Sequence, residues 1–366
     1  MKKRVFHLIS HFDLGGAERV AANIAKSENK DFEYHIVEIL RGSSDFTDGF
    51  LAELRSAGVH CHRSWMPGFH YHFMAERIAA VLFPLRFLYI WLRYRPDVIH
   101  AHTETPDMCL WAFFRVFPWL QKRCRIVRTI HNTCLWTGLK HFGMKVERFY
   151  QRNNANIAIS QSVFDCYTRE YGSMPPIIYN GVPEVRQERC PFLVDGKTNI
   201  LFAGRYDEQK GISHLIYIIR QLQDMPEYHF HVVGGGKLQN LVDAQLGTLP
   251  NVSLHNPVFG ISRYLASFDY MLMPSEFEGL PLMSVEASFA GLPVVCSDCK
   301  GLNETVPDGW QLTAHGNSHE EYMQIFRKVI PHTDRAALAQ TARRFVREHF
   351  SVEKMQAGYE QVYGQE

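Results

Sequence analysis

The chain has 366 residues, of which 46% are hydrophobic and 21% are charged. This balance is typical of a globular protein and excludes a fibrous or a disordered chain. A single domain usually has about 100–200 residues, so the length predicts two domains.

Charge is unevenly distributed along the chain, although the formal total is only +1. Residues 1–183 contain 23 Lys and Arg against 16 Asp and Glu, whereas residues 184–366 contain 16 against 22. A basic half joined to an acidic half favours an anionic partner for one of them. Nucleic acid is disfavoured as that partner, because the chain as a whole is near neutral and shows no nucleic-acid-binding motif.

The eight cysteines follow no regular spacing, and the start "MKKRVFHLIS" lacks the apolar core and the cleavage site of a signal peptide. We therefore expect free thiols and a cytoplasmic protein. The most apolar segment, residues 78–92, contains Pro84 and Arg86. It is shorter than the roughly 20 apolar residues that span a bilayer, so we expect no membrane crossing.

Apolar runs rich in β-branched residues alternate with segments of helical period from the N-terminus onward. In the first half, the expected strands are 4–10, 34–40, 97–102, 125–131 and 156–160. Between them, segments such as "GAERVAANIAKS" place apolar residues at steps of three and four. This alternation predicts a parallel sheet with helices on both faces.

Residues 175–198 contain four prolines and no clear helical period, which indicates a linker. The alternation then starts again, with strands expected at 199–205, 228–236, 251–255, 269–275 and 291–297. We therefore predict two doubly wound, Rossmann-like α/β domains, residues 1–183 and 184–350, facing each other across a cleft. The last amphipathic segment, 351–366, is expected to pack back on the first domain.

Two glycine clusters follow expected strands. Gly15 and Gly16 stand before the first helix, where a bare backbone and the free N–H groups of a helix start favour a phosphate. A second cluster lies in "VVGGGKL", residues 232–238. Neither is the G-x-G-x-x-G fingerprint, so a nicotinamide-dependent oxidoreductase is disfavoured. For the Gly15–Gly16 pair, simple turn chemistry remains an equally open interpretation.

Arg205 and Lys210 follow the first strand of the second domain. Two cations at the carboxyl end of a strand can hold a diphosphate, the arginine through its planar fork and the lysine as a point charge. Asp207 and Glu208 lie between them, so a solvated loop is the alternative interpretation.

Glu278 and Glu286 flank the start of an expected helix near Pro281, directly after an expected strand. A carboxylate beside a hydroxyl-rich ligand accepts hydrogen bonds from it. Either residue alone is also explained as a surface glutamate or as a glutamate favoured at a helix start.

The segment "SEFEGLPLMSVEASFAGLPVVCSD" resembles the E-x-seven-E signature of the retaining glycosyltransferases of family 4, which have the GT-B fold. Further motifs stand in the order of that family: "GGAERV", "PDVIHAH", "TIHN", "NGV", "AGRYDEQKG", "VVGGG" and "GLNETV". The resemblance therefore covers nearly the whole chain. In one respect the chain is shorter than the usual pattern, because Glu278 is followed directly by Gly-Leu-Pro.

The resemblance implies that residues of the second domain bind a nucleotide-sugar donor. Glu278 would meet the hydroxyls of the donor sugar, and the N–H groups of Gly279 and Leu280 would face the distal phosphate. Glu286 would hold the ribose hydroxyls.

Further roles implied by the resemblance involve both domains. Arg205 and Lys210 would neutralise the diphosphate, and Gly15 and Gly16 would complete the phosphate cradle from the first domain. His131 in "TIHN" matches the family's cleft histidine near the transferred sugar, although a core histidine at a strand end is the alternative.

Two more histidines, His100 and His102, belong to the expected strand "DVIHAH". We interpret both as scaffold and expect strand alternation to point one inward and the other outward.

Charge develops on the departing diphosphate as the sugar is transferred. The sequence contains no D-x-D triplet that would hold a metal, so we expect no metal and no cofactor. Arg205, Lys210 and helix N–H groups are then the candidates that absorb this charge, and Arg205, Lys210, Glu278 and His131 are the catalytic candidates. We expect retention of configuration through attack from the leaving-group side.

Family membership implies transfer of a hexose or N-acetylhexosamine from a nucleotide sugar, with UDP favoured as the nucleotide. The acceptor would be a growing surface glycan or an undecaprenyl-diphosphate-linked glycan, in the synthesis of capsule, O-antigen or exopolysaccharide. A nucleotide-sugar epimerase of the same two-domain fold is the alternative.

Arginines are interleaved with aromatic residues at 77–95 and 109–125 in the basic half. Such segments suit the surface of an anionic membrane, which would place the protein on the inner face of the cytoplasmic membrane. Helices that pack against a parallel sheet are also apolar, so both interpretations remain open.

Overall fold

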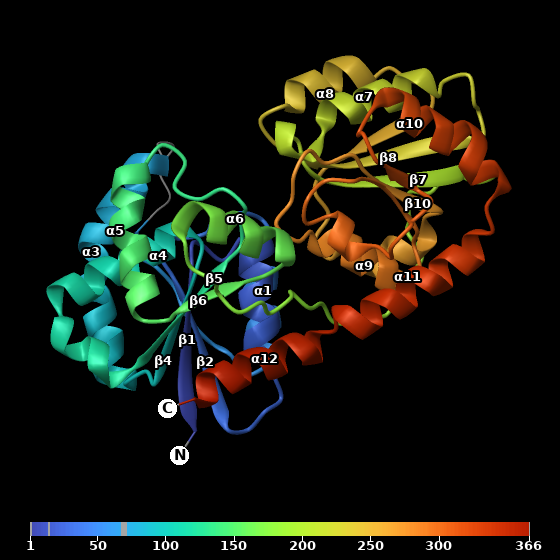
Figure 1. Ribbon diagram of the computed structural model, residues 1–366. Coiled ribbons are helices and arrows are strands. Elements are labelled where there is room, and N and C mark those ends of the chain that lie inside the picture. The colour runs from blue at the N-terminus through green and yellow to red at the C-terminus, as the bar shows by residue number, and fades with distance from the viewer. Residues whose placement is uncertain (1, 14, 67–71, 366) are drawn as a thin grey trace. The chain divides into compact units, whose positions relative to one another are not determined.

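The computed structural model describes residues 2–13, 15–66 and 72–365. The chain forms two compact units, one of Met1–Gly181 with Val352–Glu366 and the other of Val182–Ser351. Each unit holds one six-stranded parallel sheet with helices packed around it (Figure 1). The prediction of two doubly wound α/β domains is therefore confirmed.

Unit 1 has the strand order β3-β2-β1-β4-β5-β6. In Figure 1, α3, α4 and α5 lie on one side of this sheet, and α1 and α12 lie on the other. Its elements are β1 (Lys3–Ile9), α1 (Gly16–Ala25), β2 (Phe32–Glu38), α2 (Thr47–Ser56), β3 (His60–His62), α3 (His72–Tyr94), β4 (Val98–His102), α4 (Glu104–Val116), β5 (Arg125–Ile130), α5 (Lys140–Arg152), β6 (Asn156–Ala158), α6 (Gln161–Tyr171) and α12 (Val352–Gly364).

Unit 2 has the strand order β12-β11-β10-β7-β8-β9. Its elements are β7 (Thr198–Arg205), α7 (Ile212–Gln221), β8 (Tyr228–Gly235), α8 (Gln239–Leu246), β9 (Val252–His255), β10 (Tyr270–Met273), α9 (Leu282–Ala290), β11 (Val294–Ser297), β12 (Thr313–Ala314), α10 (His319–Gln324) and α11 (Arg335–His349). A short 3-10 turn, Glu208–Lys210, joins β7 to α7.

Apolar side chains explain why these segments fold as they do. In α7, Ile212, Leu215, Ile218 and Ile219 recur at steps of three and four and are fully buried. Burying one such side chain stabilises the fold by about 1.5–3 kcal/mol. All five residues of β4 are buried, because helices cover both faces of the sheet.

Two strands, β3 and β12, lie outside the sequence prediction. Each occupies an edge of its sheet and is only three or two residues long. Their residues do not form the continuous apolar run that identifies a strand buried on both faces.

The C-terminal helix α12 is an integral part of unit 1. Its Tyr359 and Tyr363 are buried and reach the middle of the sheet. Tyr359 pairs its hydroxyl with Thr129 Oγ1 at 2.8 Å, and Tyr363 pairs its hydroxyl with His100 Nδ1 at 2.7 Å. The last segment of the chain therefore completes the first core.

The strand β5 carries a buried arginine. Arg128 is 1% exposed and donates to Asp107 of α4 at 2.7 Å and to Glu147 of α5 at 2.8 Å. Such a cation is tolerated in a core only when it is paired. The pair of contacts ties both helices to the strand that precedes His131.

No helix in the described ranges is both long enough and apolar enough to cross a bilayer. The helix that contains residues 78–92, α3, includes Pro84 in its interior.

Candidate active site

The sequence-predicted residues of unit 2 gather after the carboxyl ends of its strands. Arg205 ends β7, and Lys210 ends the 3-10 turn that follows. Glu278 lies in the loop between β10 and α9, and Glu286 lies within α9. Ligands of open α/β sheets bind at this edge.

Lys210 and Glu278 form the central contact of this edge. Lys210 Nζ lies 2.7 Å from Glu278 Oε1, and both side chains are largely shielded from solvent. Ser275 donates its hydroxyl to the same carboxylate oxygen at 2.8 Å. The structure thus joins two predicted residues directly and orients the carboxylate with a third that the sequence analysis missed.

Arg205 is the exposed cation of the group, with 70% of its side chain accessible. It lies 3.4 Å from Asp207 and donates to Gln209 at 3.3 Å. Gln209 also donates to the backbone oxygen of Phe277, in the loop before Glu278, at 3.1 Å. The Asp207 contact leaves Arg205 at the surface, where an anionic ligand can reach it.

Two glycines allow close approaches at this edge. Gly211 has φ +67°, and a Cβ there would lie 1.8 Å from Pro274 O. Gly301 has φ +81°, and its Cβ would lie 2.4 Å from Glu278 O and 2.5 Å from Gly279 O. Any side chain at these positions would displace the loop that carries Glu278.

The remaining predicted residues of unit 2 surround the start of α9. Gly279 is partly exposed, Leu280 is buried, and Pro281 directly precedes the helix. Glu286 is partly exposed, one turn into the helix. The free N–H groups of a helix start face ligands bound there.

In unit 1, Gly15 and Gly16 form the start of α1. A Cβ on Gly15 would lie 2.1 Å from Glu18 Oε2, so the glycine leaves room for the Glu18 side chain to fold back over the helix start. Glu18 is 7% exposed, and burial raises its pKa. Glu18 belongs to the motif "GGAER" but was not among the predicted site residues.

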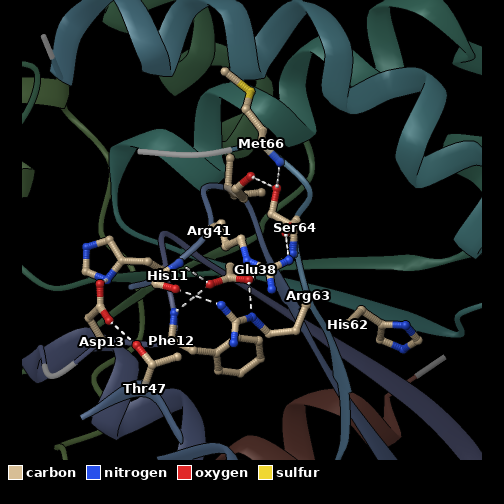
Figure 2. A network of polar contacts seen from close by, with 12 residues as sticks. His11, Phe12, Asp13, Glu38, Arg41, Thr47, His62, Arg63, Ser64 and Met66 are labelled. Atoms are coloured by element: carbon tan, nitrogen blue, oxygen red, sulfur yellow. Dashed lines mark hydrogen bonds and ion pairs between the residues drawn. The ribbon is translucent and has the colours of Figure 1, made fainter. Parts of the chain in front are cut away.

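Another buried carboxylate, Glu38 at the end of β2, holds the neighbouring loops (Figure 2). Its oxygens accept from the backbone N–H groups of Phe12 at 3.2 Å, Gly42 at 2.5 Å and Ser64 at 2.8 Å. Arg63 Nε donates to it at 2.9 Å. Glu38 therefore fixes the loop that follows β1 and leads to Gly15.

Asp13 anchors the same loop from its other side (Figure 2). It accepts from the hydroxyls of Ser44 at 2.7 Å and Thr47 at 2.5 Å. Burial alone would raise the pKa of Asp13, but these hydrogen bonds outweigh it and lower the pKa.

His131 follows β5 and contacts a histidine that was interpreted as scaffold. His131 Nε2 lies 3.1 Å from His102 Nδ1, and His102 Nε2 lies 3.0 Å from His7 Nδ1. Burial lowers the pKa of both His131 and His7 to about 3. Burial also lowers the pKa of His102 well below its ordinary value, so all three rings are neutral at pH 7.

The expectation that His100 and His102 point to opposite faces of the sheet is wrong. Both are buried, and their ring centroids lie 4.0 Å apart. Residues two apart in a strand share a face, because side chains alternate with period two. His100 instead bonds Tyr363 and Thr129, each at 2.7 Å.

Two groups among the described residues place potential metal ligands within 4.8 Å of one another: His7, His100 and His102, and Glu33, His35 and His60. In the first group, both ring nitrogens of His100 and of His102 already have hydrogen-bonding partners. A metal there would have to displace these bonds.

Comparison with known proteins matches each half of the chain to a family model. Residues 14–186 match the description "Glycosyltransferase Family 4", and residues 197–347 match "Glycosyl transferases group 1". The capsular polysaccharide biosynthesis glycosyltransferase CapH of Staphylococcus aureus is 23% identical, covering 82% of this chain and 83% of CapH. The 41.2 kDa protein in the cps region of Klebsiella pneumoniae is 26% identical over 73% of this chain and 78% of its own length.

Solved structures share the fold over nearly the full chain. A glycosyltransferase from Rickettsia africae superposes with a TM-score of 0.77 at 15% identity, covering 99% of this chain and 98% of that one. Anabaena Alr3699/HepE, solved in complex with UDP and glucose, gives 0.75 at 19% identity, with coverages of 98% and 99%.

The two parallel sheets and their likeness to these structures define the GT-B fold. Within that fold the chain is a glycosyltransferase of the family 4 and group 1 type, because its first half matches the family 4 model and its second half matches the group 1 model. The family inferred from the sequence motifs is confirmed.

Proposed function

We propose that this glycosyltransferase moves a hexose or N-acetylhexosamine from a UDP-sugar to a lipid-linked or growing surface glycan. The observation that carries the proposal is the Lys210–Glu278 pair at 2.7 Å on the carboxyl edge of the unit 2 sheet, with the exposed Arg205 nearby. The UDP bound to Anabaena Alr3699/HepE supports the nucleotide, and CapH supports the class of product.

Donor binding uses groups of opposite charge for opposite ends of the ligand. Lys210 and Arg205 attract the diphosphate, and Glu278 accepts hydrogen bonds from sugar hydroxyls. Because Lys210 is bonded to Glu278, the lysine exchanges or shares this partner when it binds the diphosphate. Gly279, Leu280 and Glu286 complete the donor site at the start of α9.

Departure of the nucleotide is assisted by fixed charges without a metal ion. Negative charge grows on the diphosphate as the glycosidic bond lengthens, and preorganised cations and helix N–H groups stabilise that state. The acceptor attacks from the side of the leaving group, so the anomeric configuration is retained. Gly15 and Gly16, at the start of α1, are further candidates for phosphate contacts.

Donor choice and chemistry are tested separately. A thermal-shift panel of UDP-, GDP-, ADP- and TDP-sugars should raise the melting temperature most for a UDP-sugar. Transfer to a polyprenyl-diphosphate-linked glycan should then release UDP, give the retained anomer by NMR, and proceed in the presence of EDTA. An inverted product, inhibition by EDTA, or conversion of the sugar without an acceptor, as in an epimerase, would contradict the proposal.

The acceptor side is proposed to dock on an anionic membrane surface through α3. This helix has two apolar faces, and one of them packs in the core through residues such as Phe83 and Phe87. The other is solvent-exposed and consists of Ile78, Val81, Leu85, Tyr89 and Leu92, with accessible fractions from 43% to 74%. Packing against the sheet explains the first face only.

Charge around this exposed face favours an anionic surface. Arg77 and Arg93 are exposed toward its two ends, and residues 77–95 contain no acidic side chain. Beside it, a hollow of about 540 Å³ is lined by apolar side chains and by His62, Arg86 and Arg63, of which Arg63 is paired with Glu38. An apolar stripe bordered by arginines binds at the interface of an anionic bilayer.

Vesicle binding tests this surface. The protein should sediment with phosphatidylglycerol vesicles, less with phosphatidylcholine vesicles, and should be released by high salt. Leu85→Glu should weaken binding, whereas Met174→Glu, an exposed residue outside α3, should not. Binding that ignores lipid charge and salt, or equal effects of both variants, would contradict membrane docking.

A further inference from the structure

Three histidines of unit 1 form a continuous hydrogen-bonded chain on one face of the sheet. His7 belongs to β1, His102 ends β4, and His131 follows β5. His7 Nδ1 lies 3.0 Å from His102 Nε2, and His102 Nδ1 lies 3.1 Å from His131 Nε2. His131 is thereby connected to a fully buried ring of the central strand.

Neutral rings can be arranged along this chain in two ways only. A neutral imidazole has one N–H and one bare nitrogen, so each contact needs one donor and one acceptor. In the first arrangement, His7 Nδ1 donates to His102, His102 Nδ1 donates to His131 Nε2, and His131 carries its hydrogen on Nδ1. In the second, every hydrogen moves to the other nitrogen, and His131 Nδ1 is bare.

The buried end of the histidine chain, at His7, distinguishes the two arrangements. His7 Nε2 is buried and has no hydrogen-bonding partner within the described part of the chain. The second arrangement would leave an N–H unpaired there, whereas the first leaves only a lone pair. Among backbone groups, orphaned buried N–H donors are rarer than under-satisfied acceptors, and the same preference applied to the His7 ring favours the first arrangement.

We infer that His102 and His7 are positioning residues that hold His131 in the Nδ1–H form. His131 Nδ1 then carries the ring hydrogen, so this atom can donate a hydrogen bond but is unable to serve as a base. The consequence for sugar transfer rests on the proposed function, because the family resemblance implies that His131 lies near the transferred sugar. The tautomer itself is independent of any substrate.

Two other histidine pairs in the protein serve as internal references. His35 Nε2 contacts Glu33 at 2.9 Å, and a carboxylate accepts only, so the hydrogen of His35 is on Nε2. His231 Nε2 contacts Asn199 Oδ1 at 2.8 Å, and the amide nitrogen of Asn199 donates to Val194 O and Lys197 O, which identifies Oδ1 as the acceptor. Both references therefore have the tautomer opposite to that inferred for His131.

Nitrogen NMR of the ligand-free protein tests the inference. With ¹⁵N-labelled histidine, long-range ¹H–¹⁵N spectra at pH 7 separate protonated from bare ring nitrogens. We expect protonated Nδ1 and bare Nε2 for His131, assigned through the loss of its signals in His131→Asn, and the reverse for His35 and His231. A protonated Nε2 on His131 would overturn the inference even if the enzyme transfers sugar as proposed.

Variants separate the positioning role from a general structural one. His102→Phe removes the donor to His131 Nε2, so both ring nitrogens of His131 should move toward intermediate shifts as the two tautomers mix. His100→Phe changes a buried histidine on the same strand that bonds Tyr363 and Thr129 instead, and should leave the His131 tautomer unchanged. Unchanged His131 shifts in a folded His102→Phe protein would contradict the role of His102. The spectrum of the unmodified protein decides the tautomer if that variant fails to fold.

Discussion

Lys210 carries a positive charge at the carboxyl edge of the unit 2 sheet and forms an ion pair with Glu278 at 2.7 Å. Changing Lys210→Gln should lower kcat by about 10²–10³-fold, because one preorganised group that stabilises developing charge is lost. Steady-state kinetics with the UDP-sugar should show this loss mainly in kcat. Combining it with Arg205→Gln should lower activity further while the protein stays folded.

A matched control is Lys197→Gln, which removes the same charge immediately before β7, at the opposite end of that strand from Arg205. Lys197 bonds the backbone oxygen of Pro226 and, among the residues that the structure describes, contacts no predicted site residue. Its loss should leave kcat within about twofold. Full activity of the Arg205→Gln/Lys210→Gln protein would refute charge stabilisation by these two residues.

Gly211 joins α7 to the end of β10 through a contact that only glycine permits. Gly211→Ala should reduce the free energy of unfolding of unit 2 by about 2–5 kcal/mol, from left-handed backbone strain and from the clash with Pro274 O. Gly309→Ala is the control, because Gly309 has φ +70° with nothing within 4 Å of its Cβ. Gly309→Ala should lower the free energy of unfolding only by the backbone strain, about 1–2 kcal/mol. Equal losses for the two variants in urea denaturation would show that the clash with Pro274 O does not contribute.

At the scale of residues, the sequence predicted which side chains approach one another only where a family motif existed. It placed Lys210 and Glu278 in one site, but it did not reveal Ser275, Glu18 or the Glu38 network. The contact of His102 with His131 depends on the register between β4 and β5, where His102 pairs with Thr129. That register cannot be predicted from a single sequence, because it depends on how the helices outside the strands pack against the sheet.

The helix α12 is the element whose role is most open to measurement. Tyr363→Phe should destabilise unit 1 by about 1–3 kcal/mol, because His100 Nδ1 loses its buried partner. Tyr363→Ala should cost about 3–5 kcal/mol, since it also leaves a cavity. Amide hydrogen exchange should show a loss of protection in unit 1 and unchanged protection in unit 2.

Tyr89→Ala provides the control for this helix prediction, because Tyr89 lies in the same unit and is 73% exposed. It should change the free energy of unfolding by no more than about 0.5 kcal/mol. If Tyr363→Ala were equally harmless, or if exchange increased in unit 2 instead, α12 would not belong to the core of unit 1.

Elements were predictable from the sequence when they were buried on both faces. The strands β1, β4, β7 and β8 are apolar runs for this reason, and their expected bounds differ from the observed ones by one residue at most. The edge strands β3 and β12 lacked the signal because they are only three and two residues long and form no continuous apolar run, whereas the other two edge strands, β6 and β9, were predicted. The two faces of α3 were also indistinguishable by composition, and only the packing shows which one is covered.

Buried neutral histidines in both units link the stability of the whole molecule to pH. His7 and His35 in unit 1 and His231 in unit 2 are fully buried. Burial lowers the pKa of His7 and His231 to about 3 and that of His35 to about 4, from an ordinary value of 6.5. Below pH 6.5 the unfolded chain binds protons that the folded protein does not, so acidification favours unfolding.

We therefore expect the free energy of unfolding to fall as the pH is lowered from 7 to 5. Each such histidine contributes about 1.4 kcal/mol per pH unit once the pH is below 6.5 and above its folded pKa. His35→Phe, which keeps the stacking on Phe6, should reduce the loss between pH 7 and pH 5 by about 2 kcal/mol in urea titrations. His349→Phe, at an exposed position, should leave the loss unchanged. Stability that is constant over this range, or that rises on acidification, would show that these rings are not held neutral by the fold.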